Sequence, residues 1–330
     1  MADEGNTTMG DAARAAFSPI FVVGVQRSGT TMLNAVLNRH PAISMGYECG
    51  FYRRLHEAFG DGVPVKEPGR GAFLDALFAV RRFEHWKLER AAVAGALEAA
   101  RGGPDGDGLL DYSAALEAIA RLHRDTHKPA ATRMGFKNPH GIYHIPFILD
   151  LFPAAQILHV IRDPRGVLNS EQEKATKARG ARDPLMPWTV IQRYRRMQTA
   201  HGAALHEAGA ARYHALYYAD LVTDFDATAR GVLDFLGLPW GDFMHTADPG
   251  AIPDAERWQH ARAQGAMDHS RLLAFRETLS REELGAVEHF CRADIAALPG
   301  GAFYASPLER WTGAARLLGR KAFGRRSAAD

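Results

Sequence analysis

The residues best suited to bind an anion lie in one short segment, Gln26–Thr31, which reads Gln-Arg-Ser-Gly-Thr-Thr. The apolar run Phe21–Val25 before it predicts a buried strand, and the residues after it have the apolar spacing of a helix. The free N–H groups in the first turn of a helix, together with its dipole, favour a negatively charged ligand. The sequence therefore predicts a phosphate site at residues 27–31.

The spacing of this segment differs by one residue from the P-loop of nucleoside triphosphatases. Thr30 follows Gly29 where that loop has the Lys that reaches the β- and γ-phosphates. The cation is instead Arg27, before the glycine, so an ATP- or GTP-hydrolysing enzyme would lack its main charge clamp. A kinase with a degenerate P-loop stays open as an alternative, as do a non-catalytic nucleotide-binding protein and a loop that only joins a strand to a helix.

A second candidate anion site follows the apolar run Ile157–Ile161. Arg162 stands at the carboxyl end of this predicted strand, where open α/β sheets place their ligands. Asp163 and Pro164 are typical of a helix start, and Ser170 lies about two turns into that helix. A guanidinium and a hydroxyl can both bind one phosphate. The alternative is a surface salt bridge for Arg162 and an ordinary helical serine.

Taken together, the two segments resemble those of sulfotransferases that use 3′-phosphoadenosine-5′-phosphosulfate (PAPS). The sequence RSGTT, followed by an apolar helix and the pair His40-Pro41, is similar to the 5′-phosphosulfate loop of tyrosylprotein-type and bacterial members. Arg162 and Ser170 match the family's 3′-phosphate motif, which a kinase has no reason to carry. The residues that the resemblance assigns to the 5′-phosphosulfate are Arg27, Ser28, Gly29, Thr30 and Thr31.

A third match is the segment 214–240, in which Tyr218 and Asp220 correspond to a Tyr-x-Asp-Leu sequence of the family. The segment ends in Leu-Gly-Leu-Pro-Trp, a helix end that the family also carries. The tyrosine lies on the cofactor side of the site in relatives, so the resemblance implies that Tyr218 binds the cofactor. A buried aromatic of the core is the alternative.

Sulfuryl transfer to a hydroxyl needs a proton acceptor and cations that stabilise the leaving phosphate. In tyrosylprotein-type relatives a Glu after the same His-Pro pair is the base, and Glu48 matches it without a gap, whereas a solvated loop carboxylate is the alternative. The family's Lys-x-Pro corresponds to residues 137–139, so the resemblance implies that Lys137 stabilises the transition state beside Arg27. His140 is the competing base, because it titrates near neutral pH and many cytosolic members use His.

Composition narrows the class of protein. The 330 residues are 46% apolar, and no apolar stretch approaches the roughly 20 residues that span a bilayer. Two cysteines, Cys49 and Cys291, give neither a disulfide framework nor a metal cluster, so we expect a cytoplasmic enzyme that needs no metal. A net charge of +2 does not favour nucleic acid. We expect a hydroxyl-bearing acceptor as partner, from a small molecule, glycan or lipid, and leave a homodimer open.

These side chains must be positioned by alternating strands and helices, a pattern that predicts a three-layer α/β/α fold with a central parallel sheet. This is the P-loop-like fold of the sulfotransferases. We expect a flexible N-terminus (1–19), a single domain (20–310) and a basic, loose C-terminal tail (311–330). A helical insertion at about 50–128 follows the first strand–helix unit and is a candidate acceptor lid, with Phe83, His85 and Trp86 as lining or core residues. The predicted strands are 20–25, 132–136, 156–161 and 212–217, and the predicted helices are 30–39, 141–150, 164–177, 225–236 and 269–297. Within the insertion we expect helices over 50–59, 72–100 and 112–126, and residues 174–187 read as a flexible loop.

Overall fold

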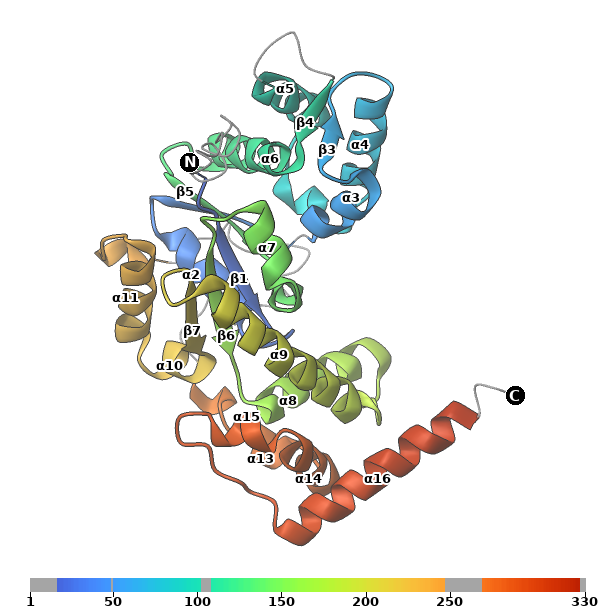
Figure 1. Cartoon of the computed structure of the whole chain (residues 1–330). Coiled ribbons are helices and arrows are strands. Elements are labelled where there is room, and N and C mark those ends of the chain that lie inside the picture. The colour runs from blue at the N-terminus through green and yellow to red at the C-terminus, as the bar shows by residue number, and fades with distance from the viewer. Residues whose placement is uncertain (1–16, 49, 102–107, 247–268, 327–330) are drawn as a thin grey trace, which may run out of the picture.

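A computed structural model of the chain describes residues 17–48, 50–101, 108–246 and 269–326. A five-stranded sheet in the order β2-β5-β1-β6-β7 lies at its centre, with the insertion above it and the C-terminal helices below it (Figure 1). All of its neighbouring strands run parallel. The strands are β1 (Ile20–Gly24), β2 (Ile43–Gly46), β5 (Arg133–Lys137), β6 (Gln156–Ile161) and β7 (Tyr213–Tyr217).

Helices cover both faces of this sheet. Side chains alternate along a strand, and in β1 Ile20 and Val22 join one buried cluster with helices α2 and α11, while Phe21 and Val23 join another with α7 and α9. The predicted three-layer α/β/α architecture is therefore confirmed. The flanking helices are α2 (Thr30–Arg39), α7 (Ile145–Leu151), α8 (Pro164–Arg179), α9 (Met186–Ala208), α10 (Tyr218–Thr223) and α11 (Phe225–Leu236), with the short turns η2 (Pro139–Tyr143) and η3 (Asp242–His245).

The insertion is more broken than the sequence predicts. The helix expected over 72–100 is divided, because Arg82 and Lys87 adopt positive φ angles of 75° and 49° on either side of a short turn. Phe83 and Trp86 are each 1% exposed, so they are core residues and not the lining of an acceptor lid. The elements are α3 (Phe51–Phe59), β3 (Gly62–Pro64), α4 (Gly69–Phe78), η1 (Phe83–Trp86), α5 (Arg90–Ala100), β4 (Leu109–Asp111) and α6 (Tyr112–His127), with β3 and β4 antiparallel.

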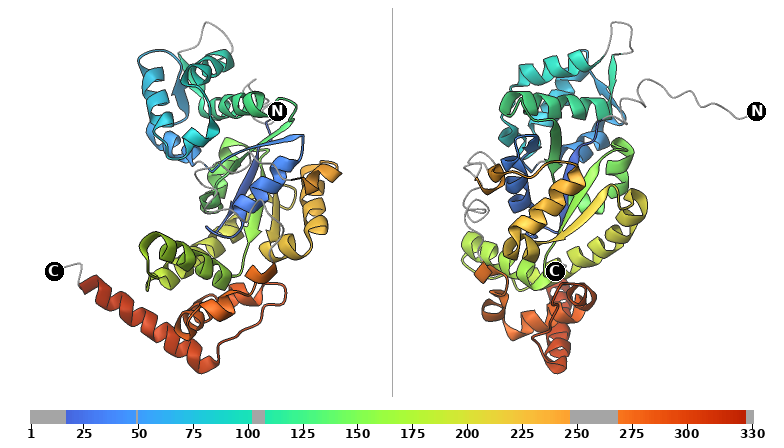
Figure 2. Two further views of the ribbon diagram at one scale, coloured as in Figure 1. Left: turned by 180° about the vertical axis from the view of Figure 1, so that it is seen from behind. Right: turned by 90° about the vertical axis from the view of Figure 1, so that its left-hand side faces the viewer.

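The C-terminal part differs from its prediction in three places. The helix expected over 269–297 is divided into four short elements, and the flexible loop expected over 174–187 is reduced to the residues between α8 and α9. Residues 311–326, expected as a loose tail, are helical, and their helix projects from the body of the molecule (Figure 2). The elements are η5 (His269–Arg271), α13 (Phe275–Thr278), α14 (Arg281–Phe290), α15 (Arg292–Ala296) and α16 (Pro307–Arg326).

The beginning of the chain needs one correction. Phe17, which we expected within a flexible N-terminus, is buried and packs edge-on against Phe152 with 5.5 Å between ring centroids. The preceding residues 1–16 and Cys49 lie outside the described residues. Phe17, three residues before β1, thus belongs to the packed core.

Candidate active site

The residues that the sequence singles out come together at one edge of the sheet, because parallel strands share their carboxyl ends. Every strand of the five contributes to this edge. Lys137 is the last residue of β5, and Arg162 and Tyr218 directly follow β6 and β7. Glu48 lies two residues after β2, and Arg27 three residues after β1. Segments far apart in the sequence therefore place their cations and their carboxylate in one region.

The first loop has the geometry of an anion site. Gly29 is the residue before α2 and has φ of 109°, and no side chain among the described residues caps this helix. The first-turn N–H groups of α2 are therefore available to a ligand. The Ser28 hydroxyl is buried and has no hydrogen-bond partner within the described chain. Unpaired donors of this kind fit a phosphate group that is bound at the loop.

Arg162 contacts this loop directly. Its Nη1 donates a hydrogen bond to the carbonyl oxygen of Arg27 over 2.8 Å, and its guanidinium lies over the Tyr218 ring, 4.2 Å from the centroid. The Nε of Arg27 in turn donates to the Ser170 hydroxyl over 3.1 Å. The loop, the start of α8 and the residue after β7 thus form one continuous basic cluster.

Burial of the Arg162 guanidinium has an energetic cost. Burial lowers the pKa of the Arg162 guanidinium from its usual value, because the group loses solvation. The nearby Arg27 lowers the same pKa further, against the opposing effect of the hydroxyls of Tyr218 and Tyr194. An anion bound between the two guanidinium groups would offset this cost, and a phosphate matches the fork geometry of arginine.

The second cluster is centred on Glu48. Its Oε2 is paired with the Nζ of Lys137, and its Oε1 lies 2.6 Å from Nη1 of Arg82. Lys137 is only 1% exposed and lies over the Tyr47 ring at 5.2 Å, so its ammonium is almost completely desolvated. A carboxylate held between two cations is ionised, as a proton acceptor must be.

His140 lies at the exposed rim of the same region. The side-chain amide of Gln26 donates to its Nε2 over 2.6 Å. Partial desolvation lowers the pKa of His140, the positive charges of Arg193, Arg196 and Arg53 add to this effect, and the Glu48 carboxylate opposes it. The imidazole is therefore neutral near pH 7 and can accept a proton.

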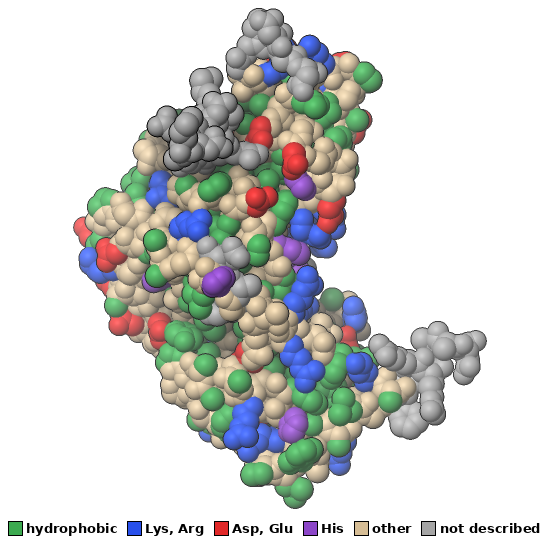
Figure 3. Space-filling model, in the orientation of Figure 1, with side chains coloured by type: hydrophobic (Ala, Val, Ile, Leu, Met, Phe, Trp, Pro, Cys, Tyr) green, Lys and Arg blue, Asp and Glu red, His purple; other side chains and the backbone are tan. Residues whose placement is uncertain are grey.

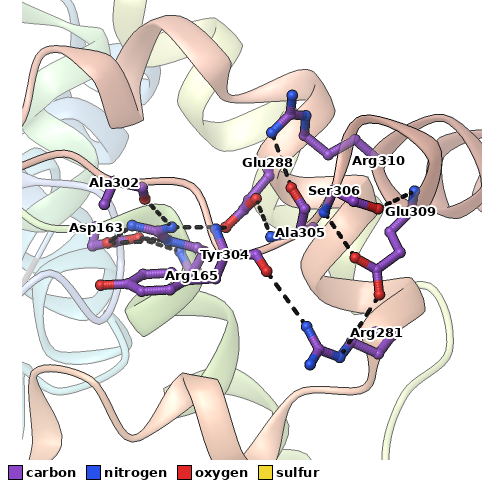
Figure 4. Close-up of polar contacts among 10 residues, drawn as sticks. All are labelled: Asp163, Arg165, Arg281, Glu288, Ala302, Tyr304, Ala305, Ser306, Glu309 and Arg310. Carbon is purple, nitrogen blue, oxygen red and sulfur yellow. Dashed lines mark hydrogen bonds and ion pairs between the residues drawn. The ribbon is translucent and has the colours of Figure 1, made fainter.

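A buried ion network supports the start of α8. Arg165 pairs with Asp163, which caps this helix, and its Nη1 lies 2.8 Å from Glu288 of α14 (Figure 4). Glu288 is 0% exposed and also accepts hydrogen bonds from the backbone N–H groups of residues 304–305, both over 2.9 Å. Because Asp163 directly follows Arg162, the C-terminal helices help to fix the position of the basic cluster.

Sequence reasoning missed four residues of this region. Arg82 belongs to the insertion, and nothing in its neighbourhood in the sequence indicates a partner in Glu48. Gln26 contacts His140, and the hydroxyl of Tyr194 donates to the carbonyl oxygen of Arg162. Arg165 could have been found, since an arginine directly after the helix-capping Asp163 is typical of a charged pair. No group of three or more His, Cys, Asp and Glu side chains that could hold a metal ion occurs in the described ranges.

Comparisons with known proteins point to one family. The model of the sulfotransferase family matches residues 19–242. Protein-tyrosine sulfotransferase 2 of Gallus gallus is 26% identical over 231 residues, which are 68% of this chain and 52% of that protein. Protein-tyrosine sulfotransferase A of Caenorhabditis elegans is 24% identical over 230 residues, which are 68% of this chain and 50% of that protein. The chain spans about half the length of the curated relatives that it matches.

Two solved structures share the fold. The sulfotransferase domain from the Synechococcus PCC 7002 olefin synthase has a TM-score of 0.53 at 18% identity, and covers 92% of this chain and 96% of that domain. The sulfotransferase domain from the curacin biosynthetic pathway has a TM-score of 0.52 at 18% identity, with coverages of 91% and 97%. The P-loop-like α/β fold predicted from the sequence is thereby confirmed.

Proposed function

The chain belongs to the sulfotransferase family, and we propose that it moves the sulfuryl group of PAPS to a hydroxyl of an acceptor. The observation that carries this proposal is the continuous contact between the two predicted phosphate sites, in which Arg162 reaches the backbone of the Gly29 loop and Arg27 reaches Ser170. Two basic sites in contact suit a nucleotide that carries a phosphate at both the 3′ and the 5′ position.

The two ends of this nucleotide have separate binding groups. The loop residues bind the 5′-phosphosulfate through backbone N–H groups and through the side chains of Arg27, Ser28, Thr30 and Thr31, with Gly29 giving the backbone turn. Arg162 and Ser170 bind the 3′-phosphate. Tyr218 lies between the two sites and packs on both, since its ring is under the Arg162 guanidinium and leaves no room for a side chain at Gly29.

For the chemical step, Glu48 accepts the proton of the acceptor hydroxyl while that oxygen attacks the sulfur. The bond between the sulfur and the bridging phosphate oxygen breaks, and the charge left on the 5′-phosphate is stabilised by Lys137 and Arg27. The alternative base is His140, which is neutral near pH 7 and accessible at the rim. The acceptor class that we propose is a small-molecule, glycan or lipid hydroxyl.

Calorimetric titration tests this proposal against the alternative of an ATP-dependent kinase. We expect 3′,5′-ADP to bind without Mg²⁺ and more tightly than ADP or Mg-ATP. Tighter binding of Mg-ATP would overturn the proposal.

The same titration tests the 3′-phosphate site. In Arg162→Ala, the affinity for 3′,5′-ADP should fall on the order of tenfold to a hundredfold, because a charge-assisted contact is lost, while the affinity for AMP, which lacks the 3′-phosphate, should change little. Arg230→Ala is the matched control, since Arg230 also lies over an aromatic ring, 4.1 Å from the centroid of Trp240, but belongs to α11. Equal losses for both nucleotides in Arg162→Ala would remove Arg162 from the 3′-phosphate site.

A further inference from the structure

Helix α16 carries an apolar stripe on its outer face. Leu308, Trp311 and Leu318 are 73%, 68% and 46% exposed, although large apolar side chains are normally buried. Ala315 and Ala322 are exposed as well. These five residues follow one another at steps of three and four, which places them on one face of the helix. We call residues 308, 311, 315, 318 and 322 the outer stripe.

The helix cannot turn this stripe inward, because its opposite face is fixed on α14. A Cβ atom at Gly313 would lie 2.6 Å from the carbonyl oxygen of Glu282, and one at Gly285 would come within 3.0 Å of the carbonyl oxygen of Glu309. The two helices therefore meet backbone to backbone, at a distance that only glycine permits. Ala314 and Leu317 complete the packed face, and both are buried.

Positive charge borders the outer stripe. The sequence of α16 contains six Lys and Arg residues and one Glu, a difference of 6 − 1 = +5. Arg316 lies on the side of the helix next to the stripe, and its side chain is 70% exposed. Arg320, 47% exposed, lies farther round toward α14, and both arginines pair with Glu282 of that helix. Lys321 lies along the other border, over the Trp188 ring at 3.6 Å. Hydrophobic and basic side chains are accordingly neighbours on the lower part of the molecule, where α16 runs (Figure 3).

We propose that α16 binds in the plane of an anionic lipid surface. The apolar stripe would enter the boundary between head groups and acyl chains, and the bordering guanidinium and ammonium groups would contact lipid phosphates and carboxylates. Trp311, whose ring also contacts that of His289, suits this position, because the ring is apolar while its N–H can still be solvated. No helix in the described ranges is long and apolar enough to cross a membrane, so the contact is peripheral.

The positive charge of α16 favours an anionic lipid surface over a second copy of the chain as the partner of the outer stripe. Two α16 helices that paired through their stripes would bring their basic borders together, and like charges at such a seam are unfavourable. An anionic surface complements both the stripe and its borders. Binding of α16 to a lipid surface does not depend on the proposed sulfuryl transfer.

Vesicle flotation of the full chain tests the proposal. The chain should float with vesicles of phosphatidylcholine and phosphatidylserine, and much less with phosphatidylcholine alone. The triple variant Leu308→Ser, Trp311→Ser, Leu318→Ser should partition at least tenfold less, on the order expected when three buried apolar side chains are removed. The variant Arg316→Gln should lose about fivefold, and only with the anionic vesicles.

The matched control replaces exposed leucines elsewhere. Leu205 and Leu273 are 44% and 47% exposed outside α16, and the double variant Leu205→Ser, Leu273→Ser should float like the unmodified chain. Three results would each overturn the proposal. The unmodified chain could stay unbound with both vesicle types, the triple variant could float as well as the unmodified chain, or light scattering could show a dimer that the triple variant abolishes without any lipid binding.

Discussion

Gly29 provides a sharp test of whether the phosphate loop and Arg162 act as one unit. Its φ of 109° is a conformation that L side chains rarely adopt, and a Cβ atom there would come within 3.0 Å of Cδ2 of Tyr218. Gly29→Ala therefore combines two effects. The backbone conformation costs about 1–2 kcal/mol, and the Tyr218 ring must also move, together with the guanidinium of Arg162 that lies over it.

Gly180→Ala separates these two effects. Gly180 ends α8 with φ of 73°, and nothing lies within 4 Å of the position its Cβ would take, so this variant has the backbone cost alone. We expect both variants to lower the melting temperature. Only Gly29→Ala should weaken binding of 3′,5′-ADP, on the order of tenfold or more, because a displaced charge-assisted contact is worth about 1.5–3 kcal/mol.

Calorimetric titration and thermal unfolding of both variants make the comparison. Adding Tyr218→Ala to Gly29→Ala should recover part of the lost stability, because it removes the clash, while the affinity for 3′,5′-ADP stays low. If Gly29→Ala and Gly180→Ala bind 3′,5′-ADP equally well, the loop and Arg162 are not coupled through Tyr218, and the reasoning fails.

The other predictions concern the base, acid stability and the buried ion network. Glu48→Gln should lower turnover by about 10²–10⁴ without weakening cofactor binding. If turnover survives there and is lost in His140→Ala, His140 is the base. Burial and the charge of His127 lower the pKa of His123 to about 3. Below pH 6.5 the unfolded chain therefore binds a proton that the folded chain does not. The free energy of unfolding thus decreases as the pH is lowered, and at pH 5 it is about 2 kcal/mol below its value at neutral pH. His123→Gln should flatten this dependence in denaturant titrations, and an unchanged slope would contradict the assignment. Glu288→Gln breaks a buried ion pair and should cost about 3–5 kcal/mol of the free energy of unfolding, whereas a loss under 1 kcal/mol would mean that the network is not stabilising.

The sequence is sufficient to predict which residues lie at the carboxyl edge of the sheet, because they stand at or shortly after the end of a buried strand. Arg27, Lys137 and Arg162 each come after an apolar run, and the ends of parallel strands meet at one edge whatever the rest of the chain does. The bounds of α11 agree with the prediction to the residue, because Asp224 caps its start and Gly237 adopts the left-handed conformation at its end. Signals within a few residues of each other were enough for these elements.

Residues that depend on contacts between distant segments could not be predicted in the same way. Arg82 reaches Glu48 only because the insertion packs Trp86 against Gly46 and turns the chain at a positive φ. The basic composition of residues 311–326 suggests a loose end, and the helix there is stabilised by its contact with α14 through Gly285 and Gly313. Neither arrangement has a signal in the residues immediately around it.

The pairing of Glu48 bears directly on how such a site can work. With Lys137 on one carboxylate oxygen and Arg82 on the other, both oxygens of Glu48 are already paired, so one pairing must loosen before the carboxylate can accept a proton. Under the proposed mechanism, Lys137 also stabilises the charge on the leaving phosphate, together with Arg27. When PAPS binds, its negative charge competes with Glu48 for the same ammonium, and a Lys137 drawn toward the phosphosulfate would free that carboxylate oxygen for a proton. The Lys137–Glu48 pair would thus couple cofactor binding to activation of the base, with Arg82 keeping the carboxylate oriented while the exchange takes place.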